Sequence, residues 1–442
     1  MELVQREKRN YSSQRCFLCC SPSSYFCPYC GESVCSELHY EYHRPPQNKD
    51  GLLKTPPSSI SSFQCYPFRL KHGDKGRYLV ATRDIQPLEL VMTDLPCVVG
   101  PPAKTVPVCL ECLTPVNNYS LSCPECSLPI CSLSCISGPH HSQECQLLSR
   151  LDHSISIQDF DKPHLLYSAI LPLRMWLLKS YNPSLWQKIN FLQEGNIEQL
   201  VSSNLWKDVA DYIKDTMKID NFPEEEFLRL TGIKATNANS LEPTGVSGTG
   251  LYPLYPLMNS YCYCNTMYSI DKTNWNMEVR AQVMIPAGME ITTRYVLPTM
   301  SQPARRNHIW NAWRFICTCD RCKDPTEFGT WFSGIRCNMC QSGWLLPYHA
   351  DLGSCWECRN CGGSLEESEL VKKLQECKKR VEMCNDGQEE ELLEELEQTL
   401  HKNHEIIIEV KSKLLQRYSG EPQTRPVMDR RLQLAMDILQ VI

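Results

Sequence analysis

The most constraining feature of this sequence is its set of closely paired cysteines. The chain of 442 residues contains 27 cysteines, and most of them stand in C-x2-C or C-x3-C pairs. An odd number of cysteines, behind an N-terminus with no apolar signal-peptide region, speaks against a disulfide framework. Two thiolates so close in sequence lie on one side of a tight turn, where a tetrahedral Zn²⁺ can take both. The sequence therefore predicts four to six zinc ions, with isolated buried thiols at Cys65, Cys97, Cys377 and Cys384.

Composition narrows the class of protein. Hydrophobic residues make up 42% and charged residues 22% of the chain, as is usual for a globular protein. The net charge of -6 argues against nucleic acid as a direct partner, because phosphate binding needs a basic surface. No uninterrupted apolar run approaches the roughly 18 residues of a membrane span. We expect an intracellular protein of the nucleus and/or cytoplasm, with its oligomeric state left open.

The densest cysteine cluster covers residues 109–145. It supplies eight ligands in four pairs, enough for two closed tetrahedral sites. Pairing the first pair with the third and the second with the fourth gives a cross-brace, with His140 as an alternative to His141. The predicted ligands are Cys109, Cys112, Cys131 and Cys135 on one ion, and Cys123, Cys126, His141 and Cys145 on the other.

Residues 11–45 repeat this order but lack an eighth ligand. One predicted site uses Cys16, Cys19, Cys35 and His39, with Cys20 as a substitute for Cys19. An incomplete second site would use Cys27, Cys30 and His43. Because four protein ligands leave no open position for catalysis, zinc in such clusters is structural.

Two more cysteine groups follow late in the chain. Cys337, Cys340, Cys358 and Cys361 have the spacing of a zinc ribbon, with Cys355 as a spare. Cys317, Cys319 and Cys322 are three ligands, one short of a tetrahedron. The sequence between the clusters alternates in strand fashion over 65–100 and 250–297, and has helical periodicity over 160–230 and after 366.

Several stretches resemble the SET-and-MYND family of protein-lysine methyltransferases, arthropod-type branch, over about residues 65–365. The 109–145 ligand order resembles a MYND finger, a protein-interaction module. Lys75-Gly76-Arg77-Tyr78 looks like the first SET motif, whose loop backbone touches S-adenosylmethionine. Gly232–Ala238 resembles the segment whose Asn, here Asn237, reaches that cofactor. Asn259-Ser260-Tyr261-Cys262-Tyr263-Cys264-Asn265 stands where the family has Asn-His-Ser-Cys-x-Pro-Asn.

The resemblance also suggests the reactive groups. Ala287–Tyr295 looks like the strand that ends in the catalytic tyrosine, Tyr295, and Phe315 would pack on the adenine side. In the family the fourth ligand of the Cys317 group is the cysteine of the Asn-His-Ser-Cys motif, here Cys262, with Cys264 as a competitor.

The implied function is S-adenosylmethionine-dependent protein-lysine N-methylation of a histone or another protein. The alternative is an inactive SET/MYND scaffold that captures Pro-rich peptides. It rests on the substituted loop 259–265 and the short helical tail. The departures from the family are Ser260 and Tyr261 in place of His-Ser, Cys264 in place of a proline, and Trp313 in place of a second tyrosine.

The expected fold is α+β, a β-rich SET core split by a MYND finger. The expected parts are an N-terminal MYND-like finger 11–45, a linker 46–64, SET segments 65–108 and 231–300, the MYND finger 109–145, a helical insert 146–230, a post-SET segment 301–327, a zinc ribbon 328–365 and C-terminal helices 366–442.

Overall fold

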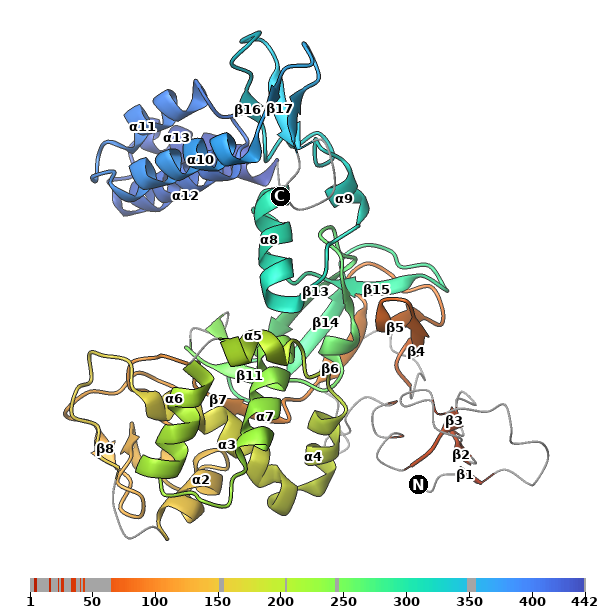
Figure 1. Ribbon diagram of the computed structural model, residues 1–442, viewed down its shortest axis with the longest axis vertical. Coiled ribbons are helices and arrows are strands. Elements are labelled where there is room, and N and C mark those ends of the chain that lie inside the picture. The colour runs from red at the N-terminus through yellow and green to blue at the C-terminus, as the bar shows by residue number, and fades with distance from the viewer. Residues whose placement is uncertain are drawn as a thin grey trace. The chain divides into compact units, whose positions relative to one another are not determined.

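The computed structural model describes most of the chain after residue 64 (Figure 1). The described ranges are 65–150, 155–202, 205–242, 246–347 and 355–440, together with residues 4–5, 16, 23, 25–27, 33–36, 40 and 43. The chain divides into two compact units. Unit 1 comprises residues 1–259 and 264–293, and unit 2 comprises residues 260–263 and 294–442.

The β-strands of unit 1 form short antiparallel sheets. Two of these sheets carry the SET region, in the strand orders β12-β15-β5-β4 and β13-β14-β6, and a third has the order β10-β11-β7. The strands are β4 (Phe68–Gly73), β5 (Gly76–Ala81), β6 (Leu90–Asp94), β7 (Val98–Gly100), β10 (Ala238–Ser240), β11 (Thr249–Leu251), β12 (Asn259–Ser260), β13 (Thr266–Ile270), β14 (Met277–Ala281) and β15 (Glu290–Thr293).

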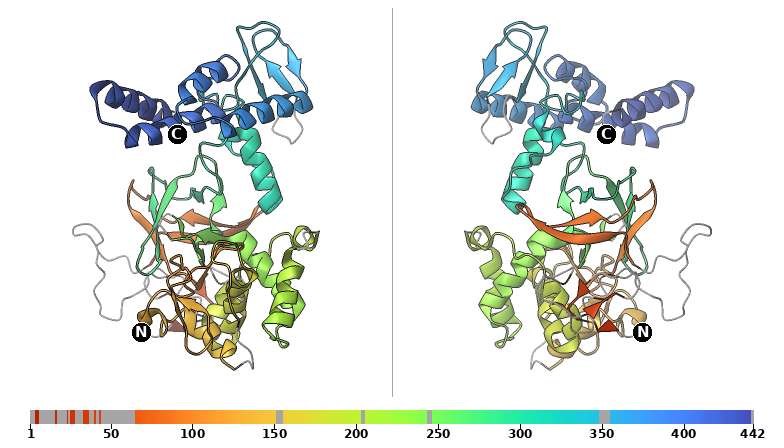
Figure 2. Two further views of the ribbon diagram at one scale, coloured as in Figure 1. Left: turned by 90° about the vertical axis from the view of Figure 1, so that its left-hand side faces the viewer. Right: turned by 90° about the vertical axis from the view of Figure 1, so that its right-hand side faces the viewer.

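Strands far apart in sequence lie side by side in these sheets. β15 pairs with β5 through Ile291 and Leu79, and β14 pairs with β6 through Val279 and Met92. Figure 2 shows the same arrangement as orange strands next to green ones. Along β14, buried residues alternate with half-buried ones, as expected for a strand with one face on the core. The finger and the helical insert are therefore inserted between strands that pair with each other.

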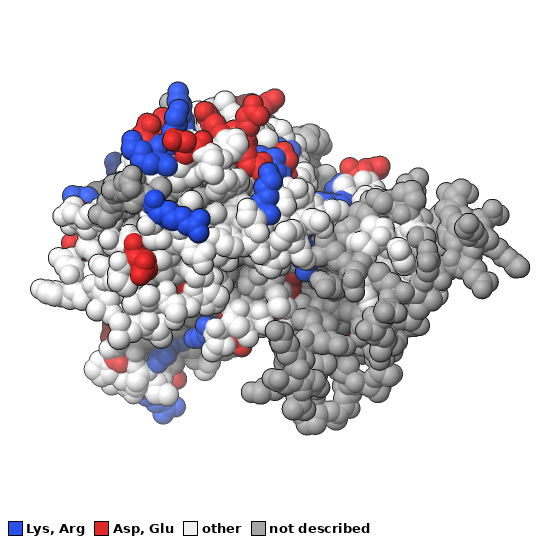
Figure 3. Space-filling model, turned by 90° about the horizontal axis from the view of Figure 1, so that it is seen from below, with Lys and Arg blue, Asp and Glu red and all other residues white. Residues whose placement is uncertain are grey.

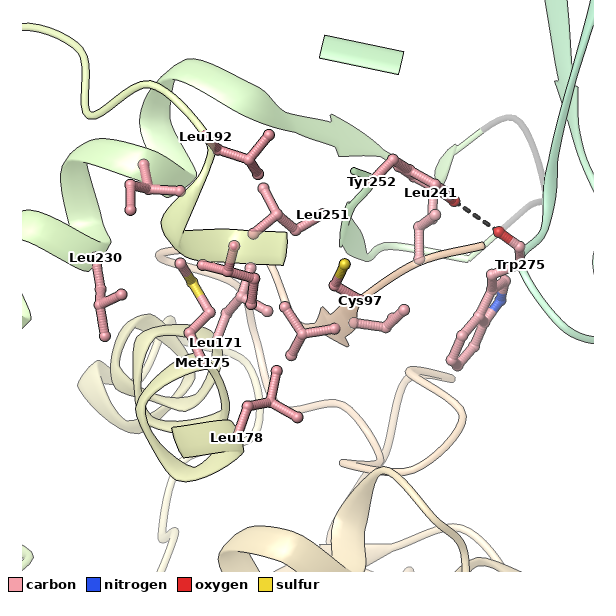
Figure 4. Packing of buried hydrophobic residues seen from close by; sticks show 14 of the residues in the cluster. Cys97, Leu171, Met175, Leu178, Leu192, Leu230, Leu241, Leu251, Tyr252 and Trp275 are labelled. Carbon is pink, nitrogen blue, oxygen red and sulfur yellow. Dashed lines mark hydrogen bonds between the residues drawn. The ribbon is translucent and has the colours of Figure 1, made fainter. Parts of the chain in front are cut away.

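Helices cover the rest of unit 1. They are α2 (His141–Leu148), α3 (Leu165–Tyr181), α4 (Pro183–Asn190), α5 (Ile197–Ser202), α6 (Leu205–Asp211), the π-helical turn η2 (Tyr212–Thr216) and α7 (Glu224–Asn237). The central helix α3 is buried along nearly its whole length, which matches its apolar composition. The side chains of Leu171, Met175 and Leu178 point into the core beside Cys97 (Figure 4).

Two finger regions add small sheets to unit 1. The finger 109–145 contains β8 (Leu121–Ser122), β9 (Pro129–Ile130) and the turn η1 (Leu133–Cys135). The N-terminal region contains the sheet β1-β2-β3, with β1 (Val4–Gln5), β2 (Tyr25–Phe26) and β3 (Ser33–Val34).

Unit 2 contains the zinc ribbon and helices. The ribbon is the four-stranded antiparallel sheet β16-β17-β18-β19. Its strands are β16 (Ile335–Arg336), β17 (Trp344–Pro347), β18 (Trp356–Cys358) and β19 (Ser364–Leu365). The helices are α8 (Gln302–Trp313), α9 (Asp320–Lys323), α10 (Glu367–Glu382), α11 (Glu389–Glu397), α12 (Glu405–Gly420) and α13 (Arg425–Leu439).

The predicted α+β class is confirmed, and strands and helices occur where their patterns predicted them. The linker 46–64 lies outside the described residues. None of the helices within the described ranges is both long enough and apolar enough to cross a membrane. Cys97 and Cys377 are buried among hydrophobic side chains, as predicted, whereas Cys384 is only partly buried and packs at the edge of such a cluster.

Candidate functional site

The cysteine clusters can be tested against the geometry of a zinc site. Four sulfurs about 2.3 Å from one ion in a tetrahedron lie about 3.8 Å from each other, whereas a disulfide brings two sulfurs to about 2.05 Å. In four complete clusters and one partial cluster of described residues, every ligand atom lies within 4.8 Å of every other. These donor sets therefore fit Zn²⁺.

The structure brings together the two ligand sets predicted for the cross-brace of residues 109–145. One cluster joins Cys109, Cys112, Cys131 and Cys135, and the other joins Cys123, Cys126, His141 and Cys145. In the first, Cys112 Sγ lies 3.3 Å from Cys131 Sγ, and in the second, Cys123 Sγ lies 3.7 Å from Cys145 Sγ. Each ion would tie two segments of the finger together.

The structure identifies the histidine ligand as His141. Its Nε2 lies 3.7 Å from Cys126 Sγ, while the ring of His140 packs against the ring of Trp275 at 5.0 Å. His141 begins helix α2, so Cys145 follows on the same helix face one turn later. Spacing i, i+4 brings both ligands to one ion, which the spacing i, i+5 from His140 would not.

A buried ion pair orients this ligand and connects the finger to the helical insert. Glu144 Oε1 lies 3.5 Å from His141 Nδ1, and the Glu144 carboxylate accepts hydrogen bonds from Arg174 of α3. Arg174 also donates to the carbonyls of Val99 and Leu110, at 2.7 and 2.5 Å. A carboxylate behind a histidine ligand fixes its ring and raises its basicity. Arg174 thus links strand β7, the finger and α3 through fully buried contacts.

The post-SET cluster lies within unit 2 and joins distant parts of the sequence. Cys262 Sγ lies 3.8 Å from Cys317 Sγ and 3.6 Å from Cys322 Sγ, and Cys319 completes the set. All four residues are buried. The Sγ of the competitor Cys264 instead donates to the carbonyl of Thr266 at 3.1 Å. The structure therefore brings Cys262, and not Cys264, to the three later cysteines.

Buried charges surround this cluster. Four thiolates on one Zn²⁺ carry a net charge of -2, and Arg305 Nη2 donates to Cys322 Sγ at 3.5 Å. Arg305 also pairs with Glu327 at 2.5 Å, and Arg321 lies 3.2 Å from the same carboxylate. The two cations compensate the thiolate charge and Glu327 orients them, as partners beyond the ligands do in metal sites.

Tyr261, one of the departures from the family motif, contacts the same region. Its hydroxyl donates to Asp320 Oδ2 at 2.5 Å, and Asp320 lies between the ligands Cys319 and Cys322. The larger side chain therefore adds a second connection between the Cys262 loop and the post-SET turn.

The zinc ribbon has the predicted ligands. Cys337 Sγ lies 3.7 Å from Cys361 Sγ, and Cys340 Sγ lies 3.8 Å from Cys358 Sγ. Cys355 is exposed and stands outside the cluster, as predicted.

In the N-terminal region the outcome differs from the prediction. Cys27 and His43 come together with Cys65, so the interpretation of Cys65 as an isolated thiol is wrong. Spacing missed this ligand because Cys65 stands alone, far beyond His43 in sequence. Cys16 and Cys35 are described, whereas Cys19, Cys20, Cys30 and His39 lie outside the described residues.

The cofactor residues predicted in unit 1 lie on three elements. Lys75 is exposed in the β4–β5 turn, and Tyr78 is half-buried on β5. Arg77 donates to the carbonyl of Phe191 at 2.7 Å and covers its ring, so its side chain fastens the helical insert. Asn237 Nδ2 donates to the carbonyls of Gln193 and Ile233, at 2.7 and 2.8 Å.

The loop 259–265 is fixed at both of its ends in unit 1. Asn259 Nδ2 donates to Glu290 Oε1 at 2.7 Å. Asn265 exchanges hydrogen bonds with β15, since its Oδ1 accepts from Thr292 N and its Nδ2 donates to Glu290 O, both at 2.8 Å. Asn265 was only part of the matched motif in the sequence. Its side chain anchors the loop that carries Cys262.

The remaining candidates lie in unit 2. Ser260 Oγ is buried and has no hydrogen-bond partner among the described residues. The Tyr295 ring lies 4.7 Å from the ring of Trp313, at the end of α8. Burial raises the pKa of the Tyr295 hydroxyl to about 12, so it keeps its proton at neutral pH. Phe315 is exposed.

Among known proteins, the chain is similar in sequence to several that are named for SET domains or as histone-lysine N-methyltransferases. No family model matches the chain. It is 27% identical over 318 residues to the SET domain-containing protein SmydA-8 of Drosophila melanogaster, covering 67% of each chain. It is 24% identical over 324 residues to the histone-lysine N-methyltransferase ASHR1 of Arabidopsis thaliana, covering 68% of this chain and 64% of the relative. It is 23% identical over 336 residues to a SET and MYND domain-containing protein of Dictyostelium discoideum, covering 62% and 64%.

Among solved structures, the SET domain of LSMT bound to lysine and AdoHcy matches with a TM-score of 0.36 and 13% identity, covering 85% of this chain and 84% of that one. The chain spans about two thirds of the length of the curated relatives it matches.

The paired strands, the inserted cross-braced finger and the Cys262 cluster agree with the SET domain and MYND-type finger that the resemblance implies. The chain is similar to proteins named for SET and MYND domains in Drosophila and Dictyostelium. Its similarity to the Drosophila SmydA-8 protein is consistent with the arthropod-type branch.

Proposed function

We propose that this protein is an S-adenosylmethionine-dependent protein-lysine N-methyltransferase. The observation that carries the proposal is the four-sulfur cluster of Cys262 with Cys317, Cys319 and Cys322. The family resemblance implies the same joining of the Cys262 loop to the post-SET segment, and this agreement supports the proposal. The relatives named histone-lysine N-methyltransferases support the same activity.

The reaction requires alignment more than acid–base chemistry. When bound, S-adenosylmethionine supplies a methyl group whose C–S bond breaks as a C–N bond forms to a neutral lysine amine, the ammonium proton having gone to solvent. Tyr295 would hold the lysine nitrogen through its hydroxyl. Because its pKa is raised to about 12, this hydroxyl acts as a neutral hydrogen-bonding group and not as a base.

The residues of the loop are compatible with a bound polar cofactor. Ser260 Oγ is buried without a partner among the described residues, and leaving a buried hydroxyl unpaired costs free energy. A polar ligand group next to this loop would remove that cost. Arg77 and Asn237 use their side-chain donors within the protein, so we assign contacts with the cofactor in those segments to the main chain.

We propose a protein substrate, a histone or another protein, in the nucleus and/or cytoplasm. On the face drawn in Figure 3, described Lys and Arg side chains lie among Asp and Glu side chains. Together with the net charge of -6, this mixed surface favours a protein partner over direct nucleic-acid binding.

We assign capture of Pro-rich peptides to the finger 109–145. Tyr119, Leu121 and Leu133 expose their side chains on this finger, and Tyr119 is 95% exposed. An exposed aromatic ring provides the flat apolar surface on which a proline-rich segment can dock. A fluorescence titration with Pro-rich peptides should show binding that Tyr119→Ser weakens and that Met383→Ser, a change of an exposed residue in unit 2, leaves unchanged.

The activity is tested on the zinc-loaded full chain. Isothermal titration should show saturable binding of S-adenosylmethionine, and methyl label from the cofactor should reach lysines of histones or of other proteins offered in a proteome extract. No heat and no thermal shift at millimolar cofactor would refute the proposal. Cofactor binding without transfer to any lysine would leave the alternative of an inactive scaffold.

A further inference from the structure

Cys65 stands immediately before the first SET strand and comes close to two N-terminal residues. Its Sγ lies 3.5 Å from Cys27 Sγ, and His43 brings a ring nitrogen within 4.8 Å of both sulfurs. Cys27 is fully buried and His43 is 2% exposed. Three strong metal donors thus converge in a protected position from three separate segments of the chain.

The spacing of these atoms matches a metal site and not a disulfide. A separation of 3.5 Å is far longer than the bond of about 2.05 Å between disulfide sulfurs. It is close to the edge of about 3.8 Å expected for thiolates on one tetrahedral zinc. The same separation of 3.5 Å occurs between Cys131 and Cys135 in the finger 109–145.

We infer that Cys27, His43 and Cys65 hold a Zn²⁺ ion that closes the N-terminal finger on the SET core. Cys65 takes the place of the last ligand that the local pattern of residues 11–45 lacks. Two thiolates and a neutral imidazole are a donor set that zinc prefers. The site is independent of methyl transfer and adds a fifth zinc to the four complete clusters.

The contacts around Cys65 show what this ion would connect. Tyr66 N donates to the carbonyl of His43 at 3.2 Å, and the Tyr66 hydroxyl donates to the carbonyl of Thr93 on β6 at 2.6 Å. The Tyr66 ring stacks on Phe68 of β4 at 5.2 Å. The ion would therefore fasten the finger to the strand that opens the SET sheet.

This connection has an energetic consequence. A metal that joins residues distant in sequence removes conformational freedom that the unbound chain would keep, and its binding energy becomes folding energy. Zinc would then control whether the N-terminal finger has a fixed position on unit 1. Cys65, the ligand that would make this connection, stands next to the first SET strand and outside the finger 11–45.

Native mass spectrometry of the full zinc-loaded chain tests the site. Cys65→Ser should lose one zinc per chain and keep the others. The control Cys97→Ser, a thiol of unit 1 outside the metal-binding clusters of the described residues, should keep the full count. Cys65→His, which exchanges one zinc ligand for another, should restore the lost ion. A full zinc count in Cys65→Ser would overturn the proposal, as would a wild-type mass two hydrogens low with Cys27 linked to Cys65.

If Cys65→Ser does not yield folded protein, the cobalt-substituted wild type and Cys65→His decide the question. Sulfur-to-cobalt charge-transfer absorption scales with the number of bound thiolates. In Cys65→His this absorption should decrease by the contribution of one thiolate, while the amount of bound cobalt stays the same. An unchanged spectrum would overturn the assignment.

Discussion

The two units differ in what holds them together. Unit 1 has one large hydrophobic cluster that runs from the SET strands through α3 to the finger. In unit 2 the described hydrophobic residues form separate clusters, and the cluster around the post-SET turn consists of Val296, Ile309 and four cysteines that together could hold a metal ion. Hydrophobic burial alone can stabilise the large cluster of unit 1, whereas the small cluster around the post-SET turn would depend on its ion.

Zinc would therefore have a different structural role in each unit of this chain. In unit 1 the ions of the finger 109–145 organise a local segment, which Arg174 then attaches to an existing core. Around the post-SET turn of unit 2, the ion of the Cys262 cluster would take the place of a hydrophobic core, because its four ligands are most of the buried residues of that cluster. Loss of a metal should therefore remain local in unit 1 and spread through the post-SET region in unit 2.

The largest effect is expected for Cys262→Ser. It leaves three thiolates and the buried Arg305 and Arg321 without the ion that balances them, so the chain should lose one zinc and methyl transfer should become undetectable. Zinc counting, hydrogen exchange of α8 and α9, and a methylation assay measure these effects. The control is Cys355→Ser, an exposed cysteine of the same unit outside the clusters. Equal methyl-transfer activity of the two variants would contradict the proposed dependence of the post-SET region on its ion.

A smaller effect is expected for Tyr295→Phe, which removes the proposed catalytic hydroxyl but no ligand. Turnover should fall by about 10²–10³, as for loss of one hydrogen-bond donor that acts on the transition state. Zinc content and S-adenosylmethionine affinity should stay unchanged. Tyr263→Phe, a change of an exposed tyrosine in the same unit, is the matched control. A fall in cofactor affinity equal to the fall in turnover would show that Tyr295 has a binding role instead.

Cys145→Ser tests the local role of zinc in unit 1. One ion should be lost and the amides of α2 should exchange faster, while those of β5, β6 and β14 stay protected by the hydrophobic core. Methyl transfer should persist. Hydrogen exchange measured by mass spectrometry distinguishes these segments. Loss of protection in the SET strands would mean that the finger supports the core rather than the reverse.

The smallest effect concerns pH and unit 1. Burial raises the pKa of the Asp94 carboxyl from 3.8 to about 7, against the lowering effect of hydrogen bonds from Leu254 N and Tyr255 N. The native state therefore binds a proton that the unfolded state releases between about pH 4 and 7. The stability that this group contributes is present at low pH and is lost as the pH rises through that range.

Asp94→Asn should remove this dependence. Between pH 5.5 and 7 the stability of the wild type should fall relative to the variant by up to about 1.4 kcal/mol per pH unit. Urea unfolding, detected by hydrogen exchange of amides in unit 1, measures this difference in stability. Zinc release at low pH should affect the wild type and the variant alike. Parallel curves would contradict the assigned pKa.

The sequence predicted the sites whose ligands are paired, because C-x2-C turns define a zinc site locally. It left His140 and His141 as alternatives, since only the start of α2 at His141 decides which ring shares a helix face with Cys145. It missed Cys65, whose partners come from segments that approach it only in the fold. The Glu144–Arg174 pair was out of reach for the same reason, because α3 must first pack on the finger.

The central claim is that one ion joins Cys262 to the post-SET cysteines, and anomalous diffraction at the zinc absorption edge tests it most directly. We expect an anomalous peak about 2.3 Å from the sulfurs of Cys262, Cys317, Cys319 and Cys322. A peak bound by the last three sulfurs with Cys262 turned away, or no peak among them, would contradict it.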